Sequence, residues 1–126
     1  MNFWLLGASA ALVLIGAVHS VMGERRIFLP WRAAPPRDVP RGYQVILRAS
    51  WHLPTLLGLG QAAALAVLAQ PGGGMPWHAL LAPLAAGVAA CGVLVAVATR
   101  GRHHGGLAML AAAALILGGQ ARGPGA

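Results

Sequence analysis

Hydrophobic residues in this chain gather into four runs, which short polar or proline- and glycine-rich segments separate. The runs cover residues 2–22, 50–69, 77–99 and 105–119. A bilayer core about 30 Å thick needs about 20 apolar helical residues, and the first three runs reach that length. The fourth has only about 15 residues, a length that also suits an interfacial segment. The pattern predicts an all-α fold, an integral membrane protein in which residues 1–126 form one bundle of four transmembrane helices.

Glycine and proline residues set the expected ends of these helices. Gly23 suits a left-handed cap after the first helix. If the second helix begins at Ser50, Pro54 falls in its first turn, where a missing N–H costs little; a start near Tyr43 would instead let Pro54 kink the helix. We therefore expect the Ser50 start. The segment 70–76, which contains a triple glycine, is expected to form a tight turn.

The segment 23–49 separates the first two helices and carries most of the charge. It contains four of the nine prolines: Pro30, Pro35, Pro36 and Pro40. Proline lacks a backbone N–H and restricts the residue before it. We expect an extended or irregular cytoplasmic loop along the membrane surface, and no separate domain.

Composition agrees with a membrane protein and suggests its orientation. The chain is 58% hydrophobic and 9% charged, against roughly 25% charged residues in soluble domains. All nine basic residues are Arg; eight lie in or beside 23–49 and 100–104, and only Arg122 lies on the other side. Loops rich in basic residues stay in the cytoplasm, so both termini are expected in the periplasm. Arg without Lys, with abundant Ala, Gly and Pro, suggests a GC-rich bacterial genome and hence a bacterial inner membrane.

Several function classes lack support. Charges confined to short gaps do not form the basic face that binds nucleic acid. A single cysteine, Cys91, allows no internal disulfide. The chain resembles the small multidrug exporters in length and span count, but those proteins use a carboxylate inside the first span and no predicted span here contains Asp or Glu. No phosphate-binding loop, nucleophile elbow or acid pair marks a hydrolase, so enzymatic activity is left open.

The candidate chemistry is a set of histidines at one depth. His19 and His52 each lie about one turn inside the cytoplasmic boundary of their spans, and His104 begins the fourth span on the same side. His78, on the opposite side, is interpreted as an interfacial residue. Ionisable groups inside a membrane are costly, so each is a functional hypothesis. Glu24 follows the first span, and neutralisation by its neighbours Arg25 and Arg26 is the favoured interpretation.

Three interpretations of this set remain open. A transition metal such as zinc, iron or copper could be bound by His19, Glu24, His52 and His104, since mixed nitrogen and oxygen ligands suit these ions. Alternatively, His19 and His52 could be the axial ligands of haem b between the helices, a layout similar to that of small four-helix membrane cytochromes.

The third interpretation is structural. Here His19 hydrogen-bonds a carbonyl or Ser20, while His52 pairs with Glu24 or with a lipid phosphate, as polar side chains between transmembrane helices commonly do. The chain is then an accessory membrane subunit without a cofactor. In every case its partners are expected to be the lipid bilayer and, with so little mass outside it, further copies of the chain or another membrane protein.

Overall fold

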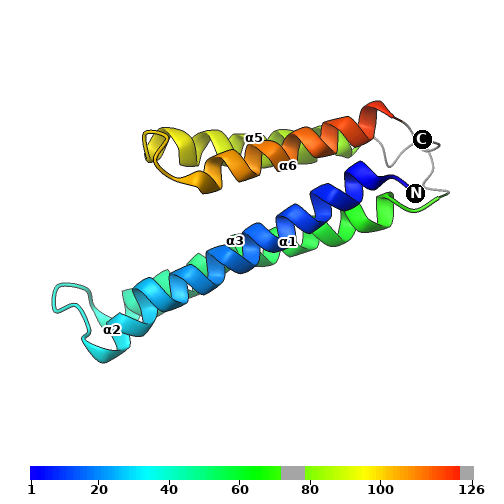
Figure 1. Cartoon of the computed structure of the whole chain (residues 1–126). Helices are drawn as coiled ribbons and strands as arrows, with labels where there is room; N and C mark the ends of the chain where they lie inside the picture. The colour runs from blue at the N-terminus through cyan, green and yellow to red at the C-terminus, as the bar shows by residue number, and fades with distance from the viewer. Residues whose placement is uncertain (72–78, 123–126) are drawn as a thin grey trace.

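The computed structural model describes residues 1–71 and 79–122, and all regular structure in these ranges is helical (Figure 1). Four helices are long and apolar enough to span a membrane, which confirms the predicted fold class at that level. The elements are α1 (Phe3–Gly23), η1 (Glu24–Phe28), α2 (Leu29–Ala33), α3 (Arg41–Leu68), α5 (Leu81–Ala98) and α6 (His104–Ala121).

The first helix runs further than the sequence indicated. Gly23 keeps right-handed helical angles (φ −60°, ψ −47°), so the expected left-handed cap is wrong, and the chain continues as helix from Phe3 to Ala33. The turn Glu24–Phe28 is a π-helix, in which the Leu29 N–H donates to the Glu24 carbonyl five residues earlier. Proline clashes with the carbonyl four residues before it in an α-helix. The wider π turn gives the ring of Pro30 room and lets the helix pass it.

The second long helix starts earlier than expected. α3 begins at Arg41 and not at Ser50, so Pro54 lies inside the helix. Hydropathy detected the apolar stretch of this helix but not the amphipathic turns before it. Much of 23–49 is therefore helical, contrary to the predicted irregular loop. Only residues 34–40, which contain three of the four prolines, lack regular helix.

The last two helices agree better with the sequence. α5 ends at Ala98, and Pro83 lies in its first turn, where a missing N–H is tolerated. The expected start of this span at Trp77, the triple-glycine turn and His78 fall outside the described residues. α6 has 18 residues, so the shortest predicted span is long enough to cross.

Asn2 ties three helices together at the end of the molecule where the chain begins. Its backbone N–H donates to the Ala69 carbonyl and its side-chain amide to the Gly119 carbonyl, both at 2.8 Å. Its side-chain oxygen accepts from the N–H groups of Trp4 and Leu5 and so caps α1. Asn2 is only 7% exposed, and both the nitrogen and the oxygen of its side-chain amide are hydrogen-bonded, as expected of a buried polar residue.

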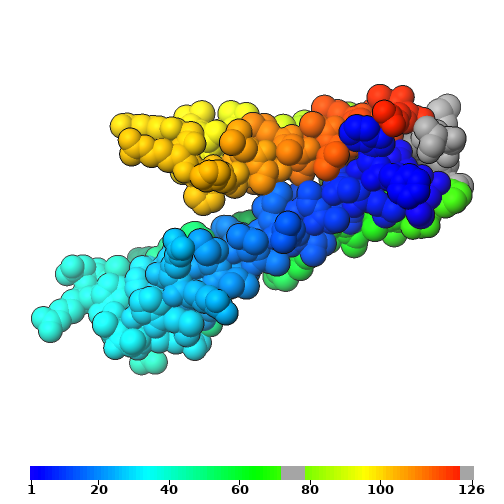
Figure 2. All heavy atoms as spheres, in the orientation of Figure 1, coloured from blue at the N-terminus to red at the C-terminus, as the bar shows by residue number. Residues whose placement is uncertain are grey.

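The hydrophobic core lies in the half of the molecule nearest Asn2. There α1 packs against α3 and α6, and α6 packs against α5. The core is built from small and branched side chains: Leu5, Ala8, Leu12, Ala62, Leu65, Ala69, Leu81, Ala85, Val88, Ala112, Ala113 and Ile116. Toward the other end, which carries α2 and the α5–α6 turn and is called the loop end below, the two helical pairs diverge (Figures 1 and 2).

Candidate functional site

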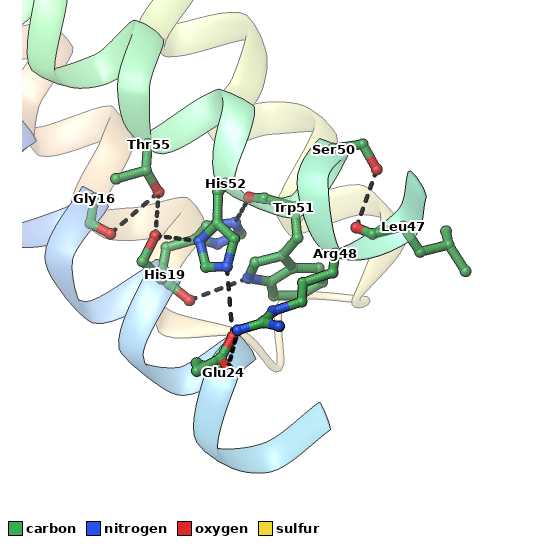
Figure 3. A network of polar contacts seen from close by, with 10 residues as sticks. Gly16, His19, Glu24, Leu47, Arg48, Ser50, Trp51, His52 and Thr55 are labelled. Atoms are coloured by element: carbon green, nitrogen blue, oxygen red, sulfur yellow. Dashed lines mark hydrogen bonds and ion pairs between the residues drawn. The ribbon is translucent and has the colours of Figure 1, made fainter. Parts of the chain in front are cut away.

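Polar contacts join α1 and η1 to α3 in the half of this pair nearest the loop end (Figure 3). We call the participating side chains the polar network: His19, Ser20, Glu24, Arg48, Trp51, His52 and Thr55. On α1 and η1, Ser20 and Glu24 are four residues apart and His19 lies beside Ser20. On α3, Arg48, His52 and Thr55 follow one another at spacings of four and three residues. Residues three or four apart share one face of a helix, so the two facing stripes meet along the contact between the helices.

His19 and Trp51 form a reciprocal pair. Their rings are stacked, with centroids 4.6 Å apart and planes 5° from parallel. The Trp51 indole N–H donates to the His19 carbonyl (3.2 Å), and His19 Nε2 donates to the Trp51 carbonyl (3.1 Å), which fixes the proton on Nε2. Each residue thus bonds the backbone of the other, which fixes the two rings across the α1–α3 contact.

Two glycines of α1 make this close approach possible. A Cβ on Gly23 would overlap the indole nitrogen of Trp51, and a Cβ on Gly16 would lie 3.3 Å from the Thr55 methyl group. Gly23 therefore leaves room for an indole ring; it does not end the helix.

A chain of three hydrogen bonds fixes the orientation of His52. Thr55 has one hydroxyl hydrogen, which it donates to the Gly16 carbonyl at 3.3 Å. The 2.9 Å contact between the Ser20 and Thr55 hydroxyls must then have Ser20 as the donor. The Ser20 oxygen in turn accepts from His52 Nδ1 at 2.8 Å. His52 therefore carries a proton on Nδ1, and its other nitrogen, Nε2, faces Glu24.

Glu24 is held by Arg48 across the helix pair. Arg48 donates from Nη2 to Oε1 (2.6 Å) and from Nε to Oε2 (3.1 Å), a two-bond geometry that suits a guanidinium and a carboxylate. His52 Nε2 lies 3.6 Å from Oε2, so a proton there would add a second ion pair. The expected neutralisation of Glu24 by its sequence neighbours Arg25 and Arg26 is wrong. The partner of Glu24 is Arg48 on α3. Arg48 is part of this helix because α3 begins at Arg41.

Phe28 closes the network at the loop end. It is 4% exposed, and its ring meets Trp31 and Trp51 edge-on, with centroids 5.9 and 6.0 Å apart. It also lies 6.2 Å from the His52 ring. Phe28 thus forms an apolar aromatic cover on one side of the network, while the Glu24 and Arg48 side chains remain partly exposed.

The structure brings together His19, Glu24 and His52, but not His104. His104 is exposed at the start of α6, on the helical pair that diverges from α1 and α3 (Figure 1). Its neighbour His103 caps α6 by accepting the Gly105 N–H on Nδ1. Within residues 1–71 and 79–122, no three His, Cys, Asp or Glu side chains are grouped so that they could hold a metal ion. The predicted four-ligand metal site is therefore not assembled.

Haem b does not fit between His19 and His52. The Nε2 of His19 already donates to a carbonyl, and one face of its ring is covered by Trp51. The helices also approach closely at Gly16 and Gly23, where a porphyrin would have to separate them. The contacts match the structural interpretation instead, in which His19 binds a carbonyl and His52 faces Glu24.

Sequence reasoning missed the roles of Arg48, Trp51 and Thr55. The signal was present, since Arg48, His52 and Thr55 have helical spacing. They face Glu24, Ser20 and Gly16, which are also spaced four residues apart. The Ser50 start hid it by placing Arg48 outside the helix. The spacing also gives no sign that Trp51 packs over Gly23, whose missing side chain leaves room for the indole ring.

No protein-family model, curated protein or solved structure matches this chain. The functional argument therefore depends on the geometry alone.

Proposed function

We propose that this chain is a structural or accessory membrane subunit, in which the histidines join helices and do not bind a cofactor. The observation that carries the proposal is the use of the imidazole nitrogens: His19 Nε2 and His52 Nδ1 are both engaged with groups on the partner helix. Among the described residues, no buried side-chain nitrogen or oxygen lacks a hydrogen-bond partner. His19 Nε2 and His52 Nδ1 are thus already used between the helices and are not available to a metal ion or a haem iron.

The exposed helix surfaces support insertion in a bilayer. In the most apolar window of each long helix, only 11–28% of the residues are buried inside the chain. Large apolar side chains such as Leu57 on α3 and Leu94 on α5 are 69% and 68% exposed. Contiguous apolar surface on this scale requires a lipid or protein partner. The subunit acts through these surfaces on copies of itself or on another membrane protein.

The distribution of arginine supports an orientation in the inner membrane of a bacterium. The eight arginines between positions 25 and 102 lie near α2 and the α5–α6 turn, which share the loop end, whereas Arg122 follows α6. The positive-inside rule places the loop end in the cytoplasm and both termini in the periplasm. Two single-cysteine proteins in a Cys91→Ser background test this orientation, one with Asp38→Cys and one with a cysteine inserted directly after Met1. An impermeant maleimide added to intact cells should label only the cysteine after Met1. Labelling of the Asp38 position instead would reverse the orientation.

The structural role and a cofactor role predict different results for the same variants. The purified protein should show no Soret band after haem supplementation and no stoichiometric zinc, iron or copper. His19→Ala and His52→Ala should each lower the free energy of unfolding by about 1 kcal/mol, within the range for hydrogen bonds between transmembrane helices. His104→Ala, an exposed histidine outside the helix pair, is the matched control and should change it less. A bound metal or haem that both His19→Ala and His52→Ala abolish would overturn the proposal.

Association is tested in native membranes. A photo-crosslinking residue at Leu57 or Leu94 should give a discrete adduct whose mass identifies either a second copy or one other membrane protein. The control is the same residue at Leu65, which is fully buried inside the chain. If neither exposed position gives a protein adduct and the purified chain has the mass of a monomer, the accessory role is wrong.

A further inference from the structure

A cationic cavity opens between α2 and the start of α3. Its volume is about 400 Å³, and three arginines, Arg32, Arg41 and Arg48, line it together with the Gln44 amide. Phe28 and Trp31 form its aromatic wall. Arg41 and Gln44 belong to the first turn of the 28-residue α3, so the positive end of this helix dipole also lies at the cavity.

The positive charge of this cavity is not balanced by the chain. Arg48 is paired with Glu24, and the ion pairs among the described residues all involve that one carboxylate. The only other acid in the sequence is Asp38. Arg32 and Arg41 therefore bring two uncompensated charges into one concave site. Arginine stays charged and presents planar donors that suit phosphate oxygens.

A second, apolar cavity adjoins the first. It has a volume of about 410 Å³ and shares Phe28 and Trp31 with the cationic cavity. Its other walls are mostly apolar, with Ile27 and Leu47 beside Trp51 and Pro54. A small soluble anion such as phosphate would gain no favourable contact from this apolar cavity.

The two cavities follow each other along α3. The first involves Arg41 to Arg48 and the second Leu47 to Pro54. At 1.5 Å per residue their centres lie about 9 Å apart along the helix, with the apolar cavity nearer the middle of the span. A phospholipid standing in a bilayer has the same order, with its phosphate at the helix end and its acyl chain toward the centre.

We propose that the two cavities together bind one anionic phospholipid, with its phosphate among Arg32, Arg41 and Arg48 and an acyl chain against Ile27, Trp51 and Pro54. Basic pockets between transmembrane helices on the cytoplasmic side are suited to such headgroups. This lipid site is independent of any protein partner, because it requires only the α1–α3 pair and α2.

The test uses the full chain in a neutral detergent, in a Trp4→Phe/Trp77→Phe background that leaves Trp31 and Trp51 as the fluorophores. Brominated phosphatidylglycerol should quench their fluorescence at a concentration at least about tenfold lower than brominated phosphatidylcholine with the same acyl chains. Inorganic phosphate at the same concentration should not displace the lipid. Equal quenching by both lipids, or displacement by phosphate at matched concentration, would refute a phospholipid site.

Two double variants with the same loss of charge separate the cavity from general surface charge. Arg32→Gln/Arg41→Gln should remove the preference for phosphatidylglycerol, at a cost of about tenfold in its affinity. Arg25→Gln/Arg26→Gln changes exposed arginines that do not line the cavity and should keep the preference. The helical circular dichroism of both should match the parent. A preference that survives in the first variant, or disappears to the same extent in the second, contradicts the proposed site.

Discussion

The two helical pairs of this protein are held together in different ways. Toward the loop end, α1 and α3 are joined by side chains: a stacked His19–Trp51 pair, a chain of hydroxyls, and the Glu24–Arg48 ion pair. Between α5 and α6 the described residues make no side-chain hydrogen bond or ion pair. There Gly92 and Gly106 let the two backbones touch, since a Cβ on either would lie about 3 Å from the carbonyl oxygen of the other.

This contrast shows where substitutions can be tolerated. A contact between a glycine and a side chain can be relieved by changing that side chain, whereas a contact between two backbones has no such remedy. The α1–α3 pair should therefore respond to paired substitutions, and the α5–α6 pair should not.

The largest effect is expected for Gly106→Ala in α6. The new methyl group would lie 2.9 Å from the Gly92 carbonyl oxygen and 3.1 Å from the Ala96 backbone nitrogen, so α5 and α6 must separate. Overpacking of this kind costs about 3 kcal/mol. Gly87→Ala in α5 is the control, because a Cβ there meets open space, and it should be neutral or stabilise the helix by up to about 1 kcal/mol. Unfolding in mixed micelles by titration with sodium dodecyl sulfate measures both.

Gly23→Ala should have the second-largest effect, about 2 kcal/mol of destabilisation, because the methyl group meets the movable indole of Trp51. Trp51→Ala alone also destabilises the pair, since it removes the stack on His19. In the Trp51→Ala background, however, Gly23→Ala should cost nothing and gain helix propensity. The same unfolding titration on all four proteins gives the coupling energy. Equal costs of Gly23→Ala in both backgrounds would show that the indole does not occupy this position.

The Glu24–Arg48 ion pair should contribute less to the free energy of unfolding than the contact of Gly23 with Trp51. Arg48 is 37% exposed and Glu24 26%, so solvent screens the attraction, and we expect a coupling energy of about 1 kcal/mol from the cycle of Glu24→Gln and Arg48→Gln. High salt should reduce it. Arg25→Gln, which removes the adjacent charge in sequence, should show little coupling to Glu24→Gln. A stronger coupling to Arg25 than to Arg48 would restore the neutralisation expected from the sequence.

The helices were predictable from the sequence because a helix that is able to span a bilayer needs a long apolar run, and the sequence has four such runs. The ends of the helices were less predictable, since hydropathy measures apolar character and not helix formation. The amphipathic stretch from Arg41 to Ala49 and the π turn before Pro30 are helical without being apolar.

The candidate site was only partly predictable for a related reason. Sequence position gives the depth of a residue along its helix, and His19 and His52 do share a level. Sequence position does not show whether two helices stay in contact or diverge at that depth. His104 was placed at the same depth, yet α6 diverges from α1 at the loop end, so the three imidazoles do not meet (Figure 1).

The smallest effect concerns the turn that closes the α5–α6 pair. The Gly101 N–H donates to the Ala96 carbonyl (2.7 Å) and the Arg100 N–H to the Val97 carbonyl (3.1 Å), the two bonds of a Schellman motif. Arg100 occupies the left-handed position of this motif with φ 51°, where glycine is usual and a side chain is strained. Arg100→Gly should therefore stabilise the protein by about 0.5–1 kcal/mol, after the greater flexibility of glycine in the unfolded chain is allowed for. Arg102→Gly removes the same charge from the same turn without relieving a positive φ, so it should not stabilise in the unfolding titration. If both variants stabilise equally, charge repulsion within the turn and not backbone strain is the cause.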